Sequence, residues 1–357
     1  MKKQANAARR DFHTLGALIL IFAALWIAQS AGALSYTARS MLIPVCCWCL
    51  MAISLNLTVG ILGELSLGHA GFMSVGAFAG VSVCQLLRVW LGWSDLPALL
   101  LSLVAAALAA ALVGLLIGLP VLRLRGDYLA IVTLAFGQII MSVLGNLYFG
   151  LSDGSPVFSL IRPISYGESK VEIIRGPTGM TNLPKLTTFP LAFVVLLLCL
   201  IVIFNLIRSR TGRAIMALRD NRIAAESIGI NVTANKLLVF SLSAAMAGMA
   251  GVLYTFNQGT VTASKFDYNQ SIMVLVFVVL GGLGSMRGSL IAAALLTVLS
   301  TLLNEFSSYR MLIYALVLIA VMLLTNNEAA KRRLASLIPR RKAVPLGERG
   351  KGGKENG

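Results

Sequence analysis

The chain has 357 residues, of which 57% are hydrophobic and only 12% are charged, and its mean hydropathy is +0.84. Soluble domains carry about 25% charged residues, so this composition excludes an ordinary soluble protein and indicates a membrane protein. The formal net charge is +16. The basic residues cluster in short loops and at both termini, which is typical of cytoplasmic loops and argues against nucleic-acid binding.

Residues 1–14 are basic and precede the first of ten apolar segments. Each segment is long enough, or nearly so, to cross a hydrocarbon layer of about 30 Å. The first is expected to remain uncleaved, because a signal peptide has a shorter apolar core. We expect membrane spans at 15–34, 41–62, 65–87, 97–120, 128–149, 188–207, 237–256, 270–285, 289–303 and 311–325.

The placement of lysine and arginine predicts that both termini are cytoplasmic. With residues 1–14 inside, 22 of the 30 basic residues fall in inside segments. Ten spans keep the basic tail 326–357 on the same side, whereas nine would place it outside. The last part of this tail is Gly-rich and is expected to be disordered. The sequence therefore predicts an all-α polytopic membrane protein whose membrane domain covers 15–325.

Ten spans divide into two halves of five, and an odd number per half gives the halves opposite orientations. This arithmetic permits an inverted repeat, which is a common plan of transporters. The third and eighth spans then correspond to each other. Glycine interrupts both of them, with "GELSLGHAG" at 63–71 in one and "LGGLGSMRGS" at 280–289 in the other.

Small residues recur every four positions on two spans, which predicts close helix packing in lipid. One stripe is Ala106, Ala110, Gly114 and Gly118, and the other is Ser243, Ala247 and Gly251, with Ala244 and Gly248 beside it. The five cysteines lie inside apolar runs, and histidine, which could complete a metal site, is scarce. We expect them to be buried free thiols rather than a metal or redox site.

The loop 150–187 is polar, holds four of the ten prolines and lies outside on this topology. Its Gly-Pro step at 176–177 and its Leu-Pro step at 183–184 favour turns. It is either an irregular cover or a docking surface for an external partner.

The loop 208–236 lies inside and is expected to form two short helices. "GRAIMALRD" predicts the first, with Ile215 and Leu218 on one face. Asp220 or Asn221 is suited to cap a second helix from about 222 to 228, and Gly229 suits a left-handed residue at its end.

The same loop carries a resemblance. "GRAIMALRDNRIAAESIGINV" followed by "KLLVFSLSAAMAGMAGVLY" resembles the permease subunits of branched-chain amino-acid ABC importers of the LivM type. So do "LSLGHAGFMSVGAFAG", "RLRGDYLAIVTLAFGQII" and "GGLGSMRGSLIAAALL", and the similarity spans roughly 40–325.

The resemblance implies that the loop 208–236 seats in a cleft of an ATPase subunit and couples it to the membrane spans. The order Ala-Ala-Glu departs from the Glu-Ala-Ala of many importers, which leaves the role of the glutamate open. Arginines of the loop either pair with acids on the ATPase or hold the loop inside. The implied coupling positions are Gly212, Arg213, Arg219, Ala224, Ala225, Glu226 and Gly229.

The family further implies a permease of the bacterial cytoplasmic (inner) membrane that forms a pathway with a second homologous permease. A periplasmic binding protein would deliver branched-chain or related small amino acids, and two ATPase subunits would bind the ATP and Mg²⁺. This chain has no GxxxxGK[ST] motif and no catalytic or metal-ligating cluster. It is therefore expected to bind no cofactor and to be no enzyme.

Glu64 and His69 form the one residue set that resembles a proton relay. An ion-coupled secondary transporter is the alternative function, but such carriers show several intramembrane carboxylates. A membrane scaffold without transport activity is a third option. We interpret His69 as a neutral imidazole bonded to a neighbouring helix, with a pathway-lining role as the alternative, and Glu64 as lying at the cytoplasmic edge. The candidate pathway residues are Asn56, Ser66, His69, Phe72, Thr133, Gln138, Asn257 and Gln258.

Overall fold

The computed structural model describes residues 2–32, 35–122, 124, 126–152, 155–159, 170–302, 316 and 319. The chain divides into two compact units, 1–307 and 308–357, and the fold below belongs to the first. The expected tenth span, 311–325, lies outside the described residues except for Leu316 and Ile319. The tail 326–357 lies outside them entirely.

Each of the first nine expected spans overlaps a helix. Within the described residues, six helical stretches are long and apolar enough to cross a membrane, namely 36–62, 69–89, 95–121, 127–145, 189–208 and 232–258, while the number of ten spans stays a prediction. The α-helices are α1 (Lys2–Ser30), α2 (Tyr36–Asn56), α3 (His69–Trp90), α4 (Asp95–Val121), α5 (Asp127–Gly145), α6 (Phe189–Arg208), α7 (Arg210–Asp220), α8 (Arg222–Ser227), α9 (Val232–Gln258), α10 (Tyr268–Gly281) and α11 (Met286–Leu302). A π-helical segment, η1 (Leu57–Leu62), continues α2, and 3₁₀ turns occupy η2 (Gly176–Thr178) and η3 (Ala263–Phe266).

The chain is predominantly helical, but the expected loop 150–187 carries a sheet that the sequence analysis did not anticipate. The strands β1 (Tyr148–Ser152), β2 (Ser155–Ser159) and β3 (Lys170–Arg175) form an antiparallel sheet in the order β2-β1-β3. Valine, isoleucine and aromatic residues in these short runs favour strands. The expected turn at 176–177 is confirmed, because η2 begins at Gly176.

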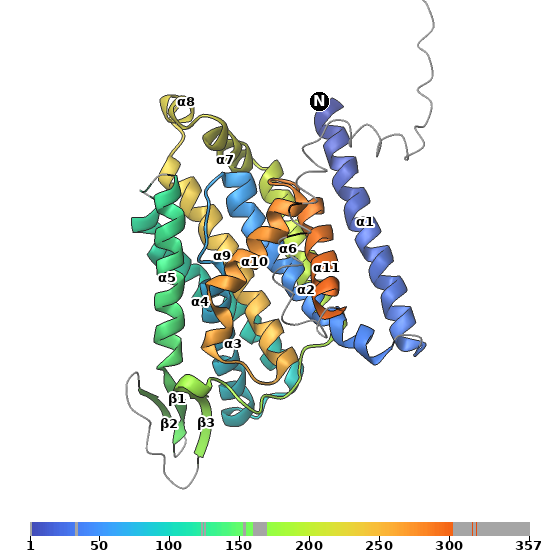
Figure 1. Ribbon diagram of the computed structural model, residues 1–357, viewed down its shortest axis with the longest axis vertical. Coiled ribbons are helices and arrows are strands. Elements are labelled where there is room, and N and C mark those ends of the chain that lie inside the picture. The colour runs from blue at the N-terminus through green and yellow to red at the C-terminus, as the bar shows by residue number, and fades with distance from the viewer. Residues whose placement is uncertain are drawn as a thin grey trace, which may run out of the picture. The chain divides into compact units, whose positions relative to one another are not determined.

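The short helices and the sheet lie at opposite ends of the helical bundle (Figure 1). Helices α7 and α8 lie at one end, together with the N-terminal end of α1, and the three strands lie at the other. This arrangement agrees with the expectation that residues 1–14 and 208–236 share one side and 150–187 the other.

Helices α3, α4 and α9 pack through their small residues. A Cβ added to Gly76 on α3 would overlap the Cα of Gly248 on α9. A Cβ on Gly114 of α4 would lie 2.8 Å from the Cβ of Ala244. Close approach of this kind replaces hydrophobic burial as the source of helix association in lipid. The expected packing role of the two stripes is therefore confirmed.

The five cysteines are buried and free, as expected. Within the described ranges, no three His, Cys, Asp or Glu side chains are grouped so as to hold a metal ion.

We expect Gly76→Ala to destabilise the protein by about 1–3 kcal/mol, because the new methyl group meets backbone that has no room to yield. The measurement is the midpoint of thermal unfolding of the detergent-purified protein. Gly16→Ala on α1 is the matched control, because nothing lies within 4 Å of its added Cβ. Equal midpoints for the two variants would contradict the packing account.

Candidate functional site

The opening of α3 follows a break in the helical chain. Segment η1 ends at Gly63, whose φ of +81° favours glycine, and residues 63–68 are not helical. Irregular backbone at membrane depth needs partners within the protein. Thr133 on α5 supplies one, because its Oγ1 accepts a hydrogen bond of 3.0 Å from the Leu67 amide. Ser271 on α10 supplies another, at 3.0 Å from the Ala70 amide. The expected interruption of the third span at its glycines is confirmed.

The second glycine-rich break lies against η1, the segment that leads into the first. Helix α10 ends at Gly281, and α11 begins at Met286. Between them, Gly284 approaches η1 so closely that a Cβ on Gly60 would overlap its backbone nitrogen. The structure thus brings together the two segments that the inverted-repeat hypothesis relates to each other, while the repeat itself stays a prediction.

Asn56 contacts the second break from a fully buried position at the end of α2. Its Oδ1 accepts a hydrogen bond of 2.9 Å from the Gly284 amide. Its Nδ2 donates one of 2.9 Å to Ser289 Oγ on α11. The expected pathway role of Asn56 stays a prediction. In this structure Asn56 bonds the end of α2 to the α10–α11 turn and to α11.

Two further side chains near the end of α2 bond to other helices. Ser54 Oγ lies 2.7 Å from His69 Nε2 on α3. Thr58 Oγ1 donates a hydrogen bond of 2.8 Å to Ser243 Oγ on α9. Ser243 Oγ in turn donates one of 2.6 Å to the Ser54 carbonyl oxygen. His69 is buried and bonded to a neighbouring helix, as expected. Glu64, the other member of the supposed proton relay, is bonded elsewhere.

Helix α7 begins at a capped turn against the end of α6. Ser209 accepts a hydrogen bond of 3.0 Å from the Gly212 amide. A Cβ on Gly212 would lie 2.6 Å from the carbonyl oxygen of Ile207, so glycine fits where the chain doubles back. Ile215 and Leu218 are buried, which confirms the expected inner face of this helix.

Helix α8 forms an exposed tip. Asn221 caps it by accepting 3.1 Å from the Ala224 amide, and Gly229 follows it with a φ of +85°. Ala225 is buried in a small apolar cluster with Leu218 and Val232. These features confirm the expected pair of short helices.

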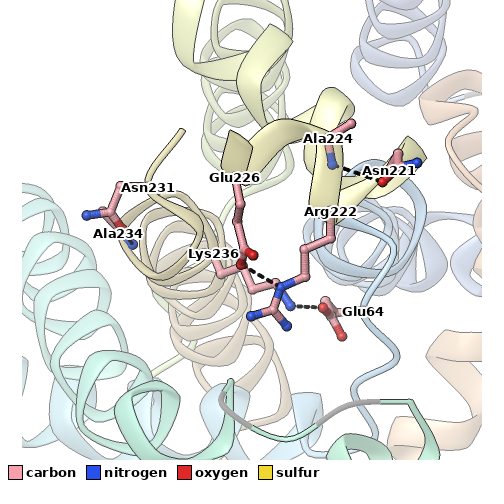
Figure 2. Close-up of polar contacts among 8 residues, drawn as sticks. All are labelled: Glu64, Asn221, Arg222, Ala224, Glu226, Asn231, Ala234 and Lys236. Atoms are coloured by element: carbon pink, nitrogen blue, oxygen red, sulfur yellow. Dashed lines mark hydrogen bonds and ion pairs between the residues drawn. The ribbon is translucent and has the colours of Figure 1, made fainter. Parts of the chain in front are cut away.

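Two ion pairs lie beneath α8 (Figure 2). Arg222 Nε lies 3.0 Å from Glu226 Oε1 on the same helix. Lys236, in the first turns of α9, pairs with Glu64 of the broken segment. The side chains of Lys236 and Glu64 are only 6% and 17% exposed, so this second pair is largely withdrawn from water.

Arg213 and Arg219 of the loop 208–236 donate hydrogen bonds to different parts of the chain. Arg213 is exposed, and its Nη1 donates 3.1 Å to the Arg208 carbonyl of its own segment. Arg219 turns toward the bundle, where its Nη1 donates 2.7 Å to the Gly60 carbonyl of η1. A cavity of about 440 Å³ lies in this region, lined in part by Glu64, Arg219, Asp220, Arg222, Glu226 and Lys236.

The expected pathway residues fall into separate groups. Ser66, His69 and Phe72 lie in and just after the first break, where Thr133 also reaches. Asn257 and Gln258 lie at the C-terminal end of α9, and Gln138 is half-buried on α5. The Ser66 hydroxyl is buried without a hydrogen-bond partner among the described residues.

Sequence analysis missed the inward role of Lys236 and two exposed apolar residues of the tip. Ile223 is 80% exposed and Ile228 is 75% exposed. The signal in the sequence was that these two isoleucines stand in a charged loop but do not share the helix face of its buried residues.

Comparison with known proteins identifies the family of this chain. Residues 38–325 match the family described as branched-chain amino acid transport system / permease component. The chain belongs to this family. The LivM permease proteins of the high-affinity branched-chain amino acid transport systems of Salmonella typhimurium and Escherichia coli are 34% and 33% identical to it. Each alignment covers 85% of this chain and 72% of the relative.

A more distant relative is the Escherichia coli permease LivH, which is 25% identical over 80% of this chain and 93% of its own length. No solved structure matches the chain. The family match and the six apolar helices identify a multi-pass permease subunit of an ABC importer in the bacterial inner membrane. The family is one of transport permeases and not of enzymes.

We expect His69→Ala to lower uptake and complex yield together, because it removes the bond to Ser54 and leaves a void in a buried site. The measurement is uptake as a function of pH, normalised to assembled complex. The normalised pH profile should match the wild type. A pH-dependent component that disappears in the variant would revive the proton-relay hypothesis.

We expect Lys236→Met to destabilise the protein by about 3 kcal/mol, because it leaves the Glu64 carboxylate largely buried and unpaired. Arg222→Met is the matched control, since its partner Glu226 is half-exposed and such pairs contribute little. Thermal unfolding of both variants provides the measurement. The double variant Glu64→Gln/Lys236→Met should recover much of the loss, and failure to recover it would argue against the ion pair.

Proposed function

We propose that this permease forms, with a second permease of the same family, the pathway for branched-chain or related small amino acids. A periplasmic binding protein delivers the substrate, and two ATPase subunits bind ATP and Mg²⁺ and drive transport. The relatives named for high-affinity branched-chain amino acid transport support this substrate class. LivM and LivH are both permeases of that system in Escherichia coli, which supports a paired permease here.

The observation that carries the proposal is the exposed apolar tip of the α7–α8 pair. Ile223 and Ile228 project from α8 and its end, whereas Ala225 on the same short helix is buried. Large apolar side chains exposed next to charged residues are typical of a protein interface. This tip lies at the end of the bundle where basic segments gather, which the positive-inside rule assigns to the cytoplasm.

The charged residues around the tip suit a polar rim. Arg222 and Glu226 form an ion pair on the surface of α8, and Arg213 donates a hydrogen bond to the Arg208 carbonyl. In this proposal the two isoleucines supply the apolar centre of the ATPase contact, and Ala224 lets the partner approach α8 closely. Arg213 and Glu226 tune the contact from its edge.

We expect the double variant Ile223→Asp/Ile228→Asp to lose the ATPase subunits on purification while the permease remains folded, because two carboxylates would be desolvated in the contact. The measurement is co-purification with the tagged permease, followed by ATP-dependent uptake of radiolabelled leucine. Thr233→Asp is the control, since it places a carboxylate on an exposed site of the same end, outside α8.

The same experiment separates the proposal from an ion-coupled carrier. A lone wild-type permease that accumulates leucine, and loses this activity with a protonophore but not on ATP depletion, would contradict it. Retention of the ATPase subunits by the double variant would remove the tip from the contact.

A further inference from the structure

Arg219 connects the α7–α8 pair to the interior of the bundle. Its Nη1 donates 2.7 Å to the carbonyl of Gly60, in the last turn of η1. Carbonyls at the end of a helix lack partners within the helix and attract cations. The bond therefore gives a helix end in the membrane domain a partner supplied from the short helices outside it.

The path of this side chain runs between glycines of both broken segments. A Cβ on Gly63 would lie 2.6 Å from Arg219 Cγ. A Cβ on Gly284 would lie 3.5 Å from Arg219 Nη1. The guanidinium thus lies at the place where the first break, 63–68, meets the turn between α10 and α11. A displacement of Arg219 acts on both segments together.

A second link reaches the same segment from the other side of α8. Lys236 follows α8 in the chain, whereas Arg219 precedes it, and Lys236 pairs with Glu64. Both links end within residues 60–64. The tip is therefore attached to η1 by Arg219 before α8 and to the first break by Lys236 after α8. Figure 2 shows the second of these contacts.

These contacts differ in kind from the apolar packing of Leu218 and Ala225 beneath the tip. Apolar surfaces resist compression but carry no direction, whereas charge-assisted hydrogen bonds fix both distance and direction. The cavity of about 440 Å³ between the tip and the bundle leaves room for α8 to shift while the two links hold.

We propose that Arg219 is the positioning residue through which movement of the α7–α8 tip reaches the two glycine-broken segments, with the Glu64–Lys236 pair as its counterpart after α8. This inference rests on the proposed function, since it assumes that an ATPase subunit moves the tip. The inference assigns docking of the ATPase to the two isoleucines and assigns to Arg219 the transmission of movement into the membrane domain.

The experiment compares Arg219→Ala, Arg219→Gln and Arg219→Lys in the complex that the permease retains on purification. The complex is placed in proteoliposomes with its binding protein, and leucine uptake and ATP hydrolysis are measured together. We expect the ATPase subunits to remain bound. The leucine moved per ATP should fall about tenfold in the Ala and Gln variants, the change expected from loss of one charge-assisted hydrogen bond. Lysine should largely restore the ratio.

Arg210→Ala is the matched control, because it removes an exposed guanidinium from the first turn of the same helix, α7. Its ratio of uptake to hydrolysis should equal that of the wild type. A merely structural role for Arg219 would lower complex yield and leave the ratio unchanged, and that result would overturn the inference. If Arg219→Ala fails to assemble, the Gln and Lys variants decide by the same ratio.

Failure of the proposed function has a different signature. The wild-type permease would then retain no ATPase subunits, or its complex would move no leucine on addition of ATP. Retained subunits and normal uptake in the wild type, with an unaltered ratio in every Arg219 variant, would refute the inference alone.

Discussion

The constraint on which this structure depends is that backbone polar groups at membrane depth must find partners within the protein. Two glycine-rich segments leave helical geometry inside the bundle, and each is supported by side chains from other helices. Thr133 and Ser271 support the first, and Asn56 supports the second. The breaks therefore persist because α5, α10 and α2 each place one small polar residue against them. An apolar bundle of the same helices would not tolerate them.

The rest of the core is held by close backbone packing rather than by polar side chains. Helices α3, α4 and α9 cross at glycines and alanines whose neighbours leave no space for a methyl group. Tightly packed backbone of this kind moves as a unit. The close crossings of α3, α4 and α9 therefore contrast with the two breaks, which are held by side-chain hydrogen bonds rather than by backbone packing.

The sequence predicted the elements whose cause is local. The helices over the first nine apolar segments, the break before His69 and the cap at Asn221 follow from hydropathy, glycine and capping residues close in the chain. It did not predict the partner of Glu64, because Lys236 lies 172 positions away. The inward direction of Arg219 likewise depends on how α7 packs. The sheet around Phe149 was missed because its strands are short and lie in a loop rich in turn signals.

The two isoleucines of α8 also affect the subunit before it is assembled. Ile223 and Ile228 are large, apolar and uncovered in the single chain. Exposed apolar surface promotes non-specific association of proteins that lack their partners. Under the proposed function, a permease made in excess of its ATPase carries this exposed apolar patch into the aqueous phase. The surface proposed for recognition would then promote aggregation whenever the parts are made in unequal amounts.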